Sequence, residues 1–249
     1  MTAGSHIPNT LMIRKLESIF PLFDDEKQAL QDLPVQVKAF KVDQDIVSIG
    51  ERPSHSCLIL EGITCTYKLT YEGKRQIMAL HVPGDIPDLQ SLHLELMDFS
   101  IAPISSPSTV GFIQHEDLRR LCERYPRLTA AFWRETLVDA SIYREWLLNI
   151  GRREAYSRMA HLICEFLFRL NAVGLVGGDT FNLPVTQTAL ADATGISSVH
   201  MSRVLQALRA DGLIKSNRTQ VTVPDLEKLK EAGEFDPRYL HLEKKKGAA

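Results

Sequence analysis

The chain has few cysteines, only four among 249 residues, and it lacks the spacings that most catalytic and metal sites require. Cys57, Cys65, Cys122 and Cys164 include no CxxC pair, which argues against a zinc site or an iron–sulfur cluster. Buried thiols are favoured over a redox sensor. The histidines show no HxH or HExxH spacing, and neither a GxxxxGK loop nor a nucleophile elbow is present. We therefore expect no catalytic residues, no enzyme activity and no bound metal.

Long apolar segments are also missing. No run approaches the length of about 18 apolar residues that a membrane-spanning helix needs. The first residues, MTAGSHIPNT, lack the charged-then-apolar pattern of a secretory signal. We therefore expect a cytoplasmic protein with no membrane partner, and its length allows two domains with separate cores.

A strong net charge is absent, since 29 basic residues stand against 31 acidic ones. The distribution is uneven, however. Residues 1–150 hold 15 basic and 20 acidic residues, whereas residues 151–223 hold 8 basic and 5 acidic ones. A basic segment in an otherwise acidic chain indicates a contact with nucleic acid there. The excess is small, so binding through a single copy would be weak and salt-dependent.

Residues 184–215 carry the most informative pattern of the sequence. They predict two short helices joined at Gly195, followed by a longer amphipathic helix that ends at Asp211-Gly212. Thr186 is the expected N-cap of the first helix. After Gly195, a buried face is predicted by apolar residues at helical spacing, which are Met201, Val204, Leu205 and Leu208. The pattern is typical of a helix-turn-helix, although helical domains that bind nothing share it.

The opposite face of the helix after Gly195 mixes a guanidinium, an amide, hydroxyls and one methyl-bearing side chain. Such a mixture suits base edges and phosphates in a major groove. The residues expected there are Ser198, Val199, His200, Ser202, Arg203 and Gln206. The following LIKSNRTQVTV predicts a β-hairpin, a wing, whose polar tip Ser216-Asn217-Arg218 would contact the DNA backbone. Double-stranded DNA is therefore the predicted partner.

From about residue 35 to residue 114 the pattern changes to short runs rich in Val, Ile, Thr and Tyr. Glycines at positions 50, 62, 73 and 84 punctuate these runs, and Tyr71-Glu72-Gly73-Lys74 predicts a hairpin turn. Short strands at this spacing predict a β-roll of the jelly-roll type. Such a unit without catalytic residues indicates a container for a small molecule, although side chains could equally fill it.

An apolar stripe at spacings of three and four predicts a long helix over residues 121–150. Its members are Trp133, Thr136, Ala140, Tyr143, Leu147 and Ile150, and it is widened by Leu128, Phe132, Leu137, Val138, Ile142 and Trp146. A helix that is apolar on more than one side must pack against the β-roll of its own chain and also against a second surface. We favour a homodimer seam over a core helix, because a weakly charged helix-turn-helix needs a second copy to contact two half-sites.

The order of these units resembles the Crp/Fnr superfamily of bacterial transcription regulators, and in particular a branch common in alphaproteobacteria. The motifs that carry the resemblance are Pro83-Gly84-Asp85, the run from Gly195 to Arg203, the run from Leu208 to Ile214, and segments 151–170 and 235–242. The expected fold is α+β. It comprises a cyclic-nucleotide-binding-like β-roll over residues 15–120, a dimerisation helix over 121–150, a Crp-type winged helix-turn-helix over 151–226 and a tail over 227–249. Gly151-Arg152-Arg153 is the expected hinge.

The resemblance implies particular contacts with DNA. Arg203 matches the arginine that contacts bases, for which a guanine edge is the expected target. Val199 stands where many members have a glutamate, so we expect a different half-site, with His200 as a further base or phosphate contact. Ser197 and Thr186 or Gln187 would contact the DNA backbone. RNA polymerase is the further partner that the resemblance implies.

The resemblance also implies an effector pocket, whose expected residues are Gly84, Asp85, Asp88 and Leu89. Cyclic-nucleotide-binding members place an arginine near this point for the phosphate, but this chain has no arginine between Arg75 and Arg119. The N-terminal cysteine cluster of the oxygen-sensing members is also absent, because the first cysteine is Cys57. We therefore expect no cofactor, neither a cyclic nucleotide nor an iron–sulfur cluster, and a small effector of another kind. A constitutive regulator or scaffold with a ligand-free β-roll is the alternative, and an enzyme acting on a nucleotide is disfavoured.

Overall fold

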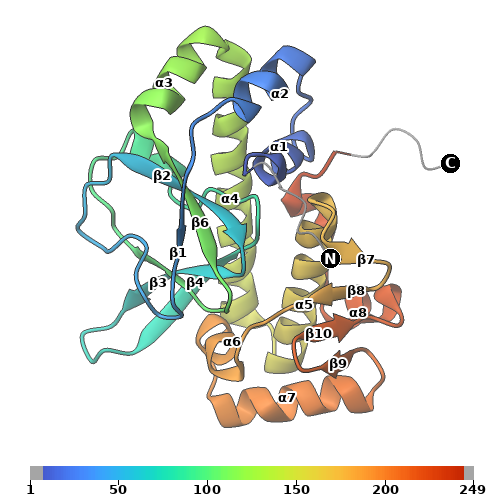
Figure 1. Cartoon of the computed structure of the whole chain (residues 1–249). Helices are drawn as coiled ribbons and strands as arrows, with labels where there is room; N and C mark the ends of the chain where they lie inside the picture. The colour runs from blue at the N-terminus through green and yellow to red at the C-terminus, as the bar shows by residue number, and fades with distance from the viewer. Residues whose placement is uncertain (1–7, 244–249) are drawn as a thin grey trace, which may run out of the picture.

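The computed structural model describes residues 8–243 and has an α+β fold (Figure 1). A β-roll packs beside a long central helix, and a winged helix-turn-helix follows at the C-terminal end, which confirms the predicted fold class. Within the described range, no helix combines the length and the apolar character needed to cross a membrane.

The β-roll consists of two three-stranded antiparallel sheets. The first has the order β1-β6-β2 (Gln36–Ala39, Thr109–Gln114 and His55–Glu61), and the second has the order β4-β3-β5 (Arg75–His81, Thr64–Leu69 and Ser100–Pro103). The predicted hairpin turn joins β3 and β4, where the Gly73 amide donates to the Thr70 carbonyl at 2.9 Å and Gly73 has a φ of +77°. Part of the roll is filled by apolar side chains, which are Phe40, Val47, Cys57, Ile59, Met97, Phe99, Ile101 and Val110.

The N-terminal half of the chain also contains helices, which precede, interrupt and follow the strands of the roll. They are α1 (Thr10–Glu17), α2 (Asp24–Gln31), the short η1 (Leu89–Leu92), α3 (His115–Arg124) and α4 (Pro126–Arg152). The long helix therefore begins five residues later and ends two residues later than predicted. Pro126 sets its start because proline suits the first turn of a helix. The expected hinge residues Gly151 and Arg152 are still helical, and the chain becomes extended only at Arg153.

The α4 helix presents an apolar face to its own chain. Most of the residues that widen the predicted stripe are buried there, namely Leu128, Phe132, Val138, Ile142 and Trp146. In contrast, Trp133, Leu137, Leu147 and Leu148 are exposed. The two-sided apolar pattern thus has one intramolecular face and one that is uncovered in the single chain.

The C-terminal unit begins with α5 (Ala155–Ala172) and a small sheet of order β7-β8-β10-β9. These strands are Val176–Gly177, Thr180–Asn182, Gln220–Thr222 and Lys215–Asn217. Between β8 and β9 lie α6 (Gln187–Thr194) and α7 (Ser198–Ala210). The segment 184–215 therefore holds two helices rather than three, because the helix after Gly195 is itself the longer amphipathic one.

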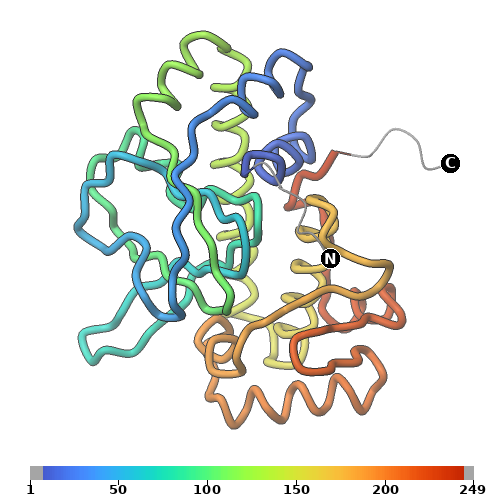
Figure 2. The backbone as a smooth tube through the Cα atoms, viewed as in Figure 1, coloured from blue at the N-terminus to red at the C-terminus, as the bar shows by residue number. Residues whose placement is uncertain are grey.

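The predicted tail contains further structure. It comprises α8 (Leu226–Ala232) and the short η2 (Pro237–Leu240), while residues 244–249 lie outside the described range. Gly233 lies against the backbone of α5, where a Cβ atom would approach the His161 nitrogen to 2.6 Å, so only glycine permits this contact. The tail then returns to the N-terminal helices, and the Glu243 amide donates to the Ser18 carbonyl at 2.7 Å (Figure 2).

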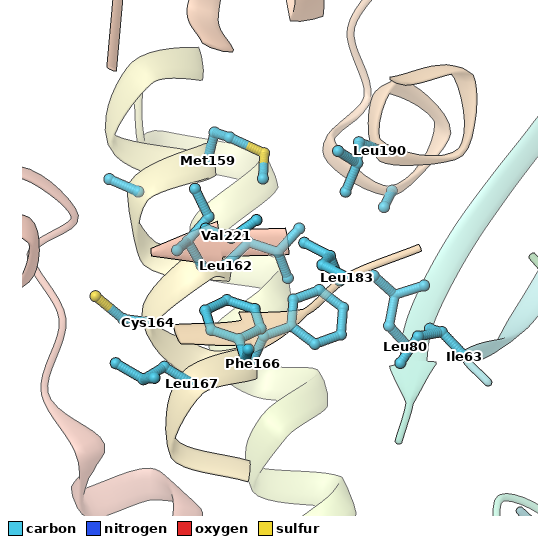
Figure 3. Close-up of a cluster of buried hydrophobic side chains, with 14 of the residues drawn as sticks. Ile63, Leu80, Met159, Leu162, Cys164, Phe166, Leu167, Leu183, Leu190 and Val221 are labelled. Atoms are coloured by element: carbon cyan, nitrogen blue, oxygen red, sulfur yellow. The ribbon is translucent and has the colours of Figure 1, made fainter. Parts of the chain in front are cut away.

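The β-roll and the C-terminal unit share one hydrophobic core, which differs from the two separate cores that the length allowed (Figure 3). Ile63 and Leu80 of the roll join Phe166 of α5 and Leu183 and Leu190 of the C-terminal unit. A polar contact borders this core, since the Arg75 guanidinium of β4 lies 2.9 Å from the Asp192 carboxylate of α6. The helix-turn-helix is therefore seated directly on the β4-β3-β5 sheet.

Candidate nucleic-acid interface

Local capping fixes the geometry of the two helices of the helix-turn-helix. The Thr186 hydroxyl accepts a hydrogen bond from the Ala189 amide at 3.2 Å, as predicted for an N-cap. Gly195 ends α6 in the left-handed conformation, with φ of +68° and ψ of +33°. Ser197 then caps α7, because its hydroxyl oxygen accepts from the His200 amide at 3.2 Å. This capping role of Ser197 was missed, since the sequence pointed only to a contact with DNA.

The α7 helix has one buried and one exposed face, and it lies along the lower edge of the molecule in Figure 1. The predicted buried face is present, with Met201, Val204, Leu205 and Leu208 in the shared core. Of the residues predicted to face DNA, Ser198, Val199, His200, Arg203 and Gln206 are exposed and Ser202 is half-buried. Val199 is 64% exposed, so its methyl groups face outward from α7. The structure therefore gathers the predicted contacts on one outward surface.

The wing extends this surface beyond α7. Strands β9 and β10 form the predicted hairpin, with Arg218 at its turn in a left-handed conformation at φ of +52°. Gln220 of β10 pairs with both Asn217 of β9 and Asn182 of β8, and all of these residues are exposed. Each amide side chain both donates and accepts hydrogen bonds, so the cluster suits phosphate and sugar groups. The sequence missed Asn182, because a three-residue strand leaves no periodic signal.

Three of the arginines that make residues 151–223 basic, namely Arg153, Arg158 and Arg169, are engaged by groups of the chain itself, and Arg153 lies 2.7 Å from the Glu145 carboxylate. The Arg158 guanidinium donates to the carbonyls of Asn149 and Ile150 at 3.0 Å and of Arg153 at 2.8 Å, and also to that of Thr194. Burial lowers the pKa of Arg158. This side chain therefore fastens the end of α4 to the end of α6. Fewer basic side chains are therefore available to DNA than the count for residues 151–223 indicates.

Arg169 belongs to a buried ionic cluster, whose members are Lys15, Asp85, Glu135, Glu165 and Arg169. Lys15 Nζ lies 2.8 Å from Asp85 Oδ1 and 3.0 Å from Glu135 Oε1. Arg169 Nη2 lies 2.7 Å from Asp85 Oδ2, and its Nη1 lies 2.9 Å from Glu165 Oε1. Burial opposes ionisation of Asp85, but the Lys15 and Arg169 cations hold the pKa of its carboxyl well below the usual range. The cluster thus joins α1, the loop after β4, α4 and α5.

The residues expected to form an effector pocket lie inside the protein, and their polar groups are engaged by other residues of the chain. Both oxygens of Asp85 are engaged in ion pairs, and Gly84 is pressed against α1, where a Cβ would meet the Leu11 carbonyl oxygen at 2.8 Å. Asp88 is fully buried, and its carboxylate accepts from the Cys57 amide at 2.7 Å. Leu89 borders an apolar pocket between η1, α3 and α4. The physical reason is that α1 covers the loop from above, which local sequence patterns do not reveal.

Burial has a further effect on the loop after β4. It raises the pKa of the Asp88 carboxyl to about 6, because the hydrogen bonds from Cys57 and from the backbone of Asp88 itself only partly offset the loss of hydration. Within residues 8–243, no group of three or more His, Cys, Asp or Glu side chains is arranged to hold a metal ion.

The chain matches two described domain families. Residues 157–232 match the Crp-like helix-turn-helix domain, and residues 37–125 match the cyclic nucleotide-binding domain. Transcriptional activator protein FnrL of Cereibacter sphaeroides is 24% identical over 216 residues, which cover 85% of this chain and 86% of the relative. The nitrogen fixation regulation protein FixK of Bradyrhizobium diazoefficiens is 28% identical over 158 residues, or 63% of this chain and 64% of the relative.

A solved structure shows the same fold. The structure of FixK2 from Bradyrhizobium japonicum aligns with a TM-score of 0.72 at 22% identity, covering 80% of this chain and 98% of that one. At this level of identity the likeness shows a shared fold over most of both chains, in agreement with the predicted fold class.

Proposed function

Because this chain belongs to the Crp/Fnr superfamily of transcription regulators, we propose that it binds a palindromic DNA site as a homodimer and regulates transcription there. The single observation that carries this proposal is the outward face of α7, on which the predicted contact residues are exposed together. RNA polymerase is the further protein partner proposed from the family, and the cytoplasm is the proposed location.

The exposed groups of α7 suit distinct parts of a DNA site. The Arg203 guanidinium has the fork of donors that matches the O6 and N7 atoms of guanine. Val199 presents methyl groups that suit the methyl of thymine, and it cannot accept a hydrogen bond from cytosine as a glutamate would. Ser197 accepts from its own helix, so its hydroxyl hydrogen is still free to donate to a phosphate. Thr186, Gln187 and the wing residue Arg218 are exposed beside this helix, where backbone contacts are proposed.

Two copies are proposed because one copy offers little positive charge and leaves α4 partly uncovered. Trp133 is 68% exposed and Leu147 is 75% exposed, and both lie on the uncovered face of α4. Several large apolar side chains exposed on one helix are typical of a protein interface. A dimer also doubles the number of phosphate contacts, which compensates for the arginines held inside the protein.

A cyclic nucleotide is not proposed as the effector. The two cations nearest the loop after β4, Lys15 and Arg169, are already paired with Asp85, and a phosphate would need one of them. We propose an effector of another chemistry, or constitutive activity with a side-chain-filled β-roll as the alternative. Neither a metal nor an iron–sulfur cofactor is part of the proposal, and no catalytic step is.

The test is a fluorescence titration of the full-length protein against a library of palindromic sites at fixed salt. We expect Arg203→Ala to weaken binding by about 1–3 kcal/mol and to relax the preference at one base position. Arg209→Ala is the matched control, because Arg209 is an exposed arginine near the other end of the same helix. If both variants weaken all sequences equally, Arg203 contacts a phosphate instead. If the wild-type protein prefers no site over bulk DNA, the proposed function is wrong.

A further inference from the structure

An apolar pocket of about 280 Å³ lies between η1, the end of α3 and the first half of α4. Its apolar lining comes from Leu89 and Leu92 of η1, Cys122 of α3, and Phe132 and Trp133 of α4, and the polar residues on its wall are Gln90, His93, Thr129 and Thr136. The hydroxyl groups of both threonines are already satisfied, since Thr129 donates to the Cys122 carbonyl at 3.3 Å and Thr136 to the Trp133 carbonyl at 2.8 Å. The pocket therefore suits an apolar occupant.

The α4 residues of this pocket have a particular spacing. Thr129, Phe132, Trp133 and Thr136 lie at −4, −1, 0 and +3 relative to Trp133. When two parallel helices pack in register, each apolar knob enters a hole formed by four residues of the facing helix. For a knob at position 133, those four residues of the facing helix are residue 133 itself and the residues at −4, −1 and +3 from it. The pocket is therefore the hole that a parallel, two-fold-related α4 would present to residue 133 of its partner.

We propose that the Trp133 indole of a second copy of this chain fills this pocket, and that the same exchange occurs in the other direction. The proposal rests on the homodimer proposed above, and it adds that each copy contributes a residue to a pocket built by the other copy's sensor domain. Trp133 is then the residue that joins the dimer helix of one protomer to the η1 loop of its partner.

Size and position favour this occupant. An apolar cavity of about 150 Å³ accommodates benzene, so 280 Å³ suits the two fused rings of an indole. The pocket is also continuous with the exposed row on α4, because Leu137 follows Trp133 by one helical turn and Leu147 lies further along the same side. A coiled-coil hole is normally shallow, but Leu89, Leu92 and Cys122 add walls from the sensor domain, which explains how a residue as large as tryptophan fits.

The arrangement has a structural consequence for signalling between protomers. Leu89 follows directly after Asp88 in the loop that carries the Asp85 ion pairs. Arg119 of α3 also holds this loop, since its Nη2 donates to the Leu92 carbonyl at 3.0 Å. A shift of η1 would therefore change the fit of the partner's Trp133.

The test uses the reactivity of Cys122 in the full-length protein. Among the four free cysteines, Cys122 is only partly buried and lines the pocket, whereas Cys57, Cys65 and Cys164 are buried. Alkylation by iodoacetamide is followed across a range of protein concentrations in which sedimentation velocity separates monomer from dimer. We expect the Cys122 of the wild-type dimer to react at least about tenfold more slowly than that of the monomer, because the partner's indole covers the thiol.

Two variants separate the effect of filling the pocket from the effect of forming the dimer. Trp133→Ala should abolish the protection of Cys122 in the dimer, and free indole added to that dimer should restore it. Leu147→Ala is the matched control, because Leu147 is equally exposed on α4 but lies away from the pocket. It should weaken dimerisation and leave Cys122 protected in the dimers that form. If Trp133→Ala prevents dimerisation altogether, Trp133→Phe should give a dimer with intermediate protection.

The outcomes separate this inference from the proposed function. A wild-type dimer whose Cys122 reacts as fast as in the monomer, or a Trp133→Ala dimer that protects Cys122 fully, overturns the inference and leaves the homodimer intact. If free indole slows alkylation in the wild-type dimer, the pocket is open and a small apolar ligand is its occupant instead. A protein that stays monomeric at all concentrations overturns both.

Discussion

Replacing Lys15 with methionine tests the buried ionic cluster most directly. The Lys15 ammonium lies between Asp85 and Glu135, and all three side chains are nearly inaccessible to solvent. Without it, Asp85 keeps the Arg169 guanidinium at 2.7 Å and the Val82 amide at 2.8 Å, but Glu135 loses its ion-pair partner. Its other oxygen, Oε2, has no hydrogen-bond partner within the described residues. An uncompensated buried charge of this kind costs about 3–5 kcal/mol of unfolding free energy.

The double variant Lys15→Met, Glu135→Met identifies the cause of that loss. Removing the second charge abolishes the uncompensated carboxylate while leaving the Asp85–Arg169 pair in place. We therefore expect the double variant to be more stable than Lys15→Met alone, by about 2 kcal/mol or more. Urea unfolding followed by tryptophan fluorescence measures both values, and Trp146 is a suitable reporter because it is buried beside Glu165.

The pH dependence of the stability of the Lys15→Met protein is a further test of this explanation. Burial already raises the pKa of Glu135, and loss of the Lys15 cation removes the charge that lowers it. In the Lys15→Met protein the folded state should therefore bind a proton on Glu135 more readily than the unfolded state does. The penalty is present at pH 8 and shrinks as the pH falls towards 5. A loss below about 1 kcal/mol for Lys15→Met, or a double variant less stable than the single one, would refute the reasoning.

Two further changes test the N-cap of α7 and the buried Asp88 in the loop after β4. Ser197→Ala removes the N-cap of α7 and should lower the unfolding free energy by about 1 kcal/mol, whereas Ser198→Ala, at the neighbouring exposed position, should have little effect; equal losses would contradict the capping role. Burial raises the folded-state pKa of Asp88 from its ordinary value of 3.8 to about 6, so ionisation of Asp88 should cost the wild-type protein about 2 kcal/mol of unfolding free energy as the pH rises from 4 to 7. Asp88→Asn should lack that loss in urea unfolding measured across this range, and an unchanged pH profile would show that Asp88 is ionised normally in the folded state.

The recognition helix was predictable because its signals are local. Helical spacing set the buried and exposed faces of α7, and Gly195 marked the turn by the left-handed conformation that it adopts. The wing followed from a short hairpin pattern, although Asn182 joined it only through the pairing of β8 with β10. Residues that act within one or two turns of each other thus leave a signal in the sequence.

The burial of the loop after β4 was not predicted, because its partners are distant in sequence. Lys15 and Arg169 lie 70 and 84 positions from Asp85. The local sequence around each cation does not distinguish it from a solvated surface charge, since burial is a property of the assembled fold. The same limit applies to Arg158, which counted as basic surface in the sequence but is committed to four carbonyl groups of its own chain.

The core shared by the β-roll and the helix-turn-helix has a consequence for how the protein behaves when it is cut. Cleavage of the backbone near Arg153 would fall between two units that look separate in the sequence, yet Leu80, Phe166 and Leu183 would still hold the two pieces together. If the fragments were forced apart, each would expose an apolar face that water disfavours and that promotes aggregation. The cleaved protein should therefore migrate as one particle under native conditions. The C-terminal unit that begins with α5 should not refold as a soluble protein by itself.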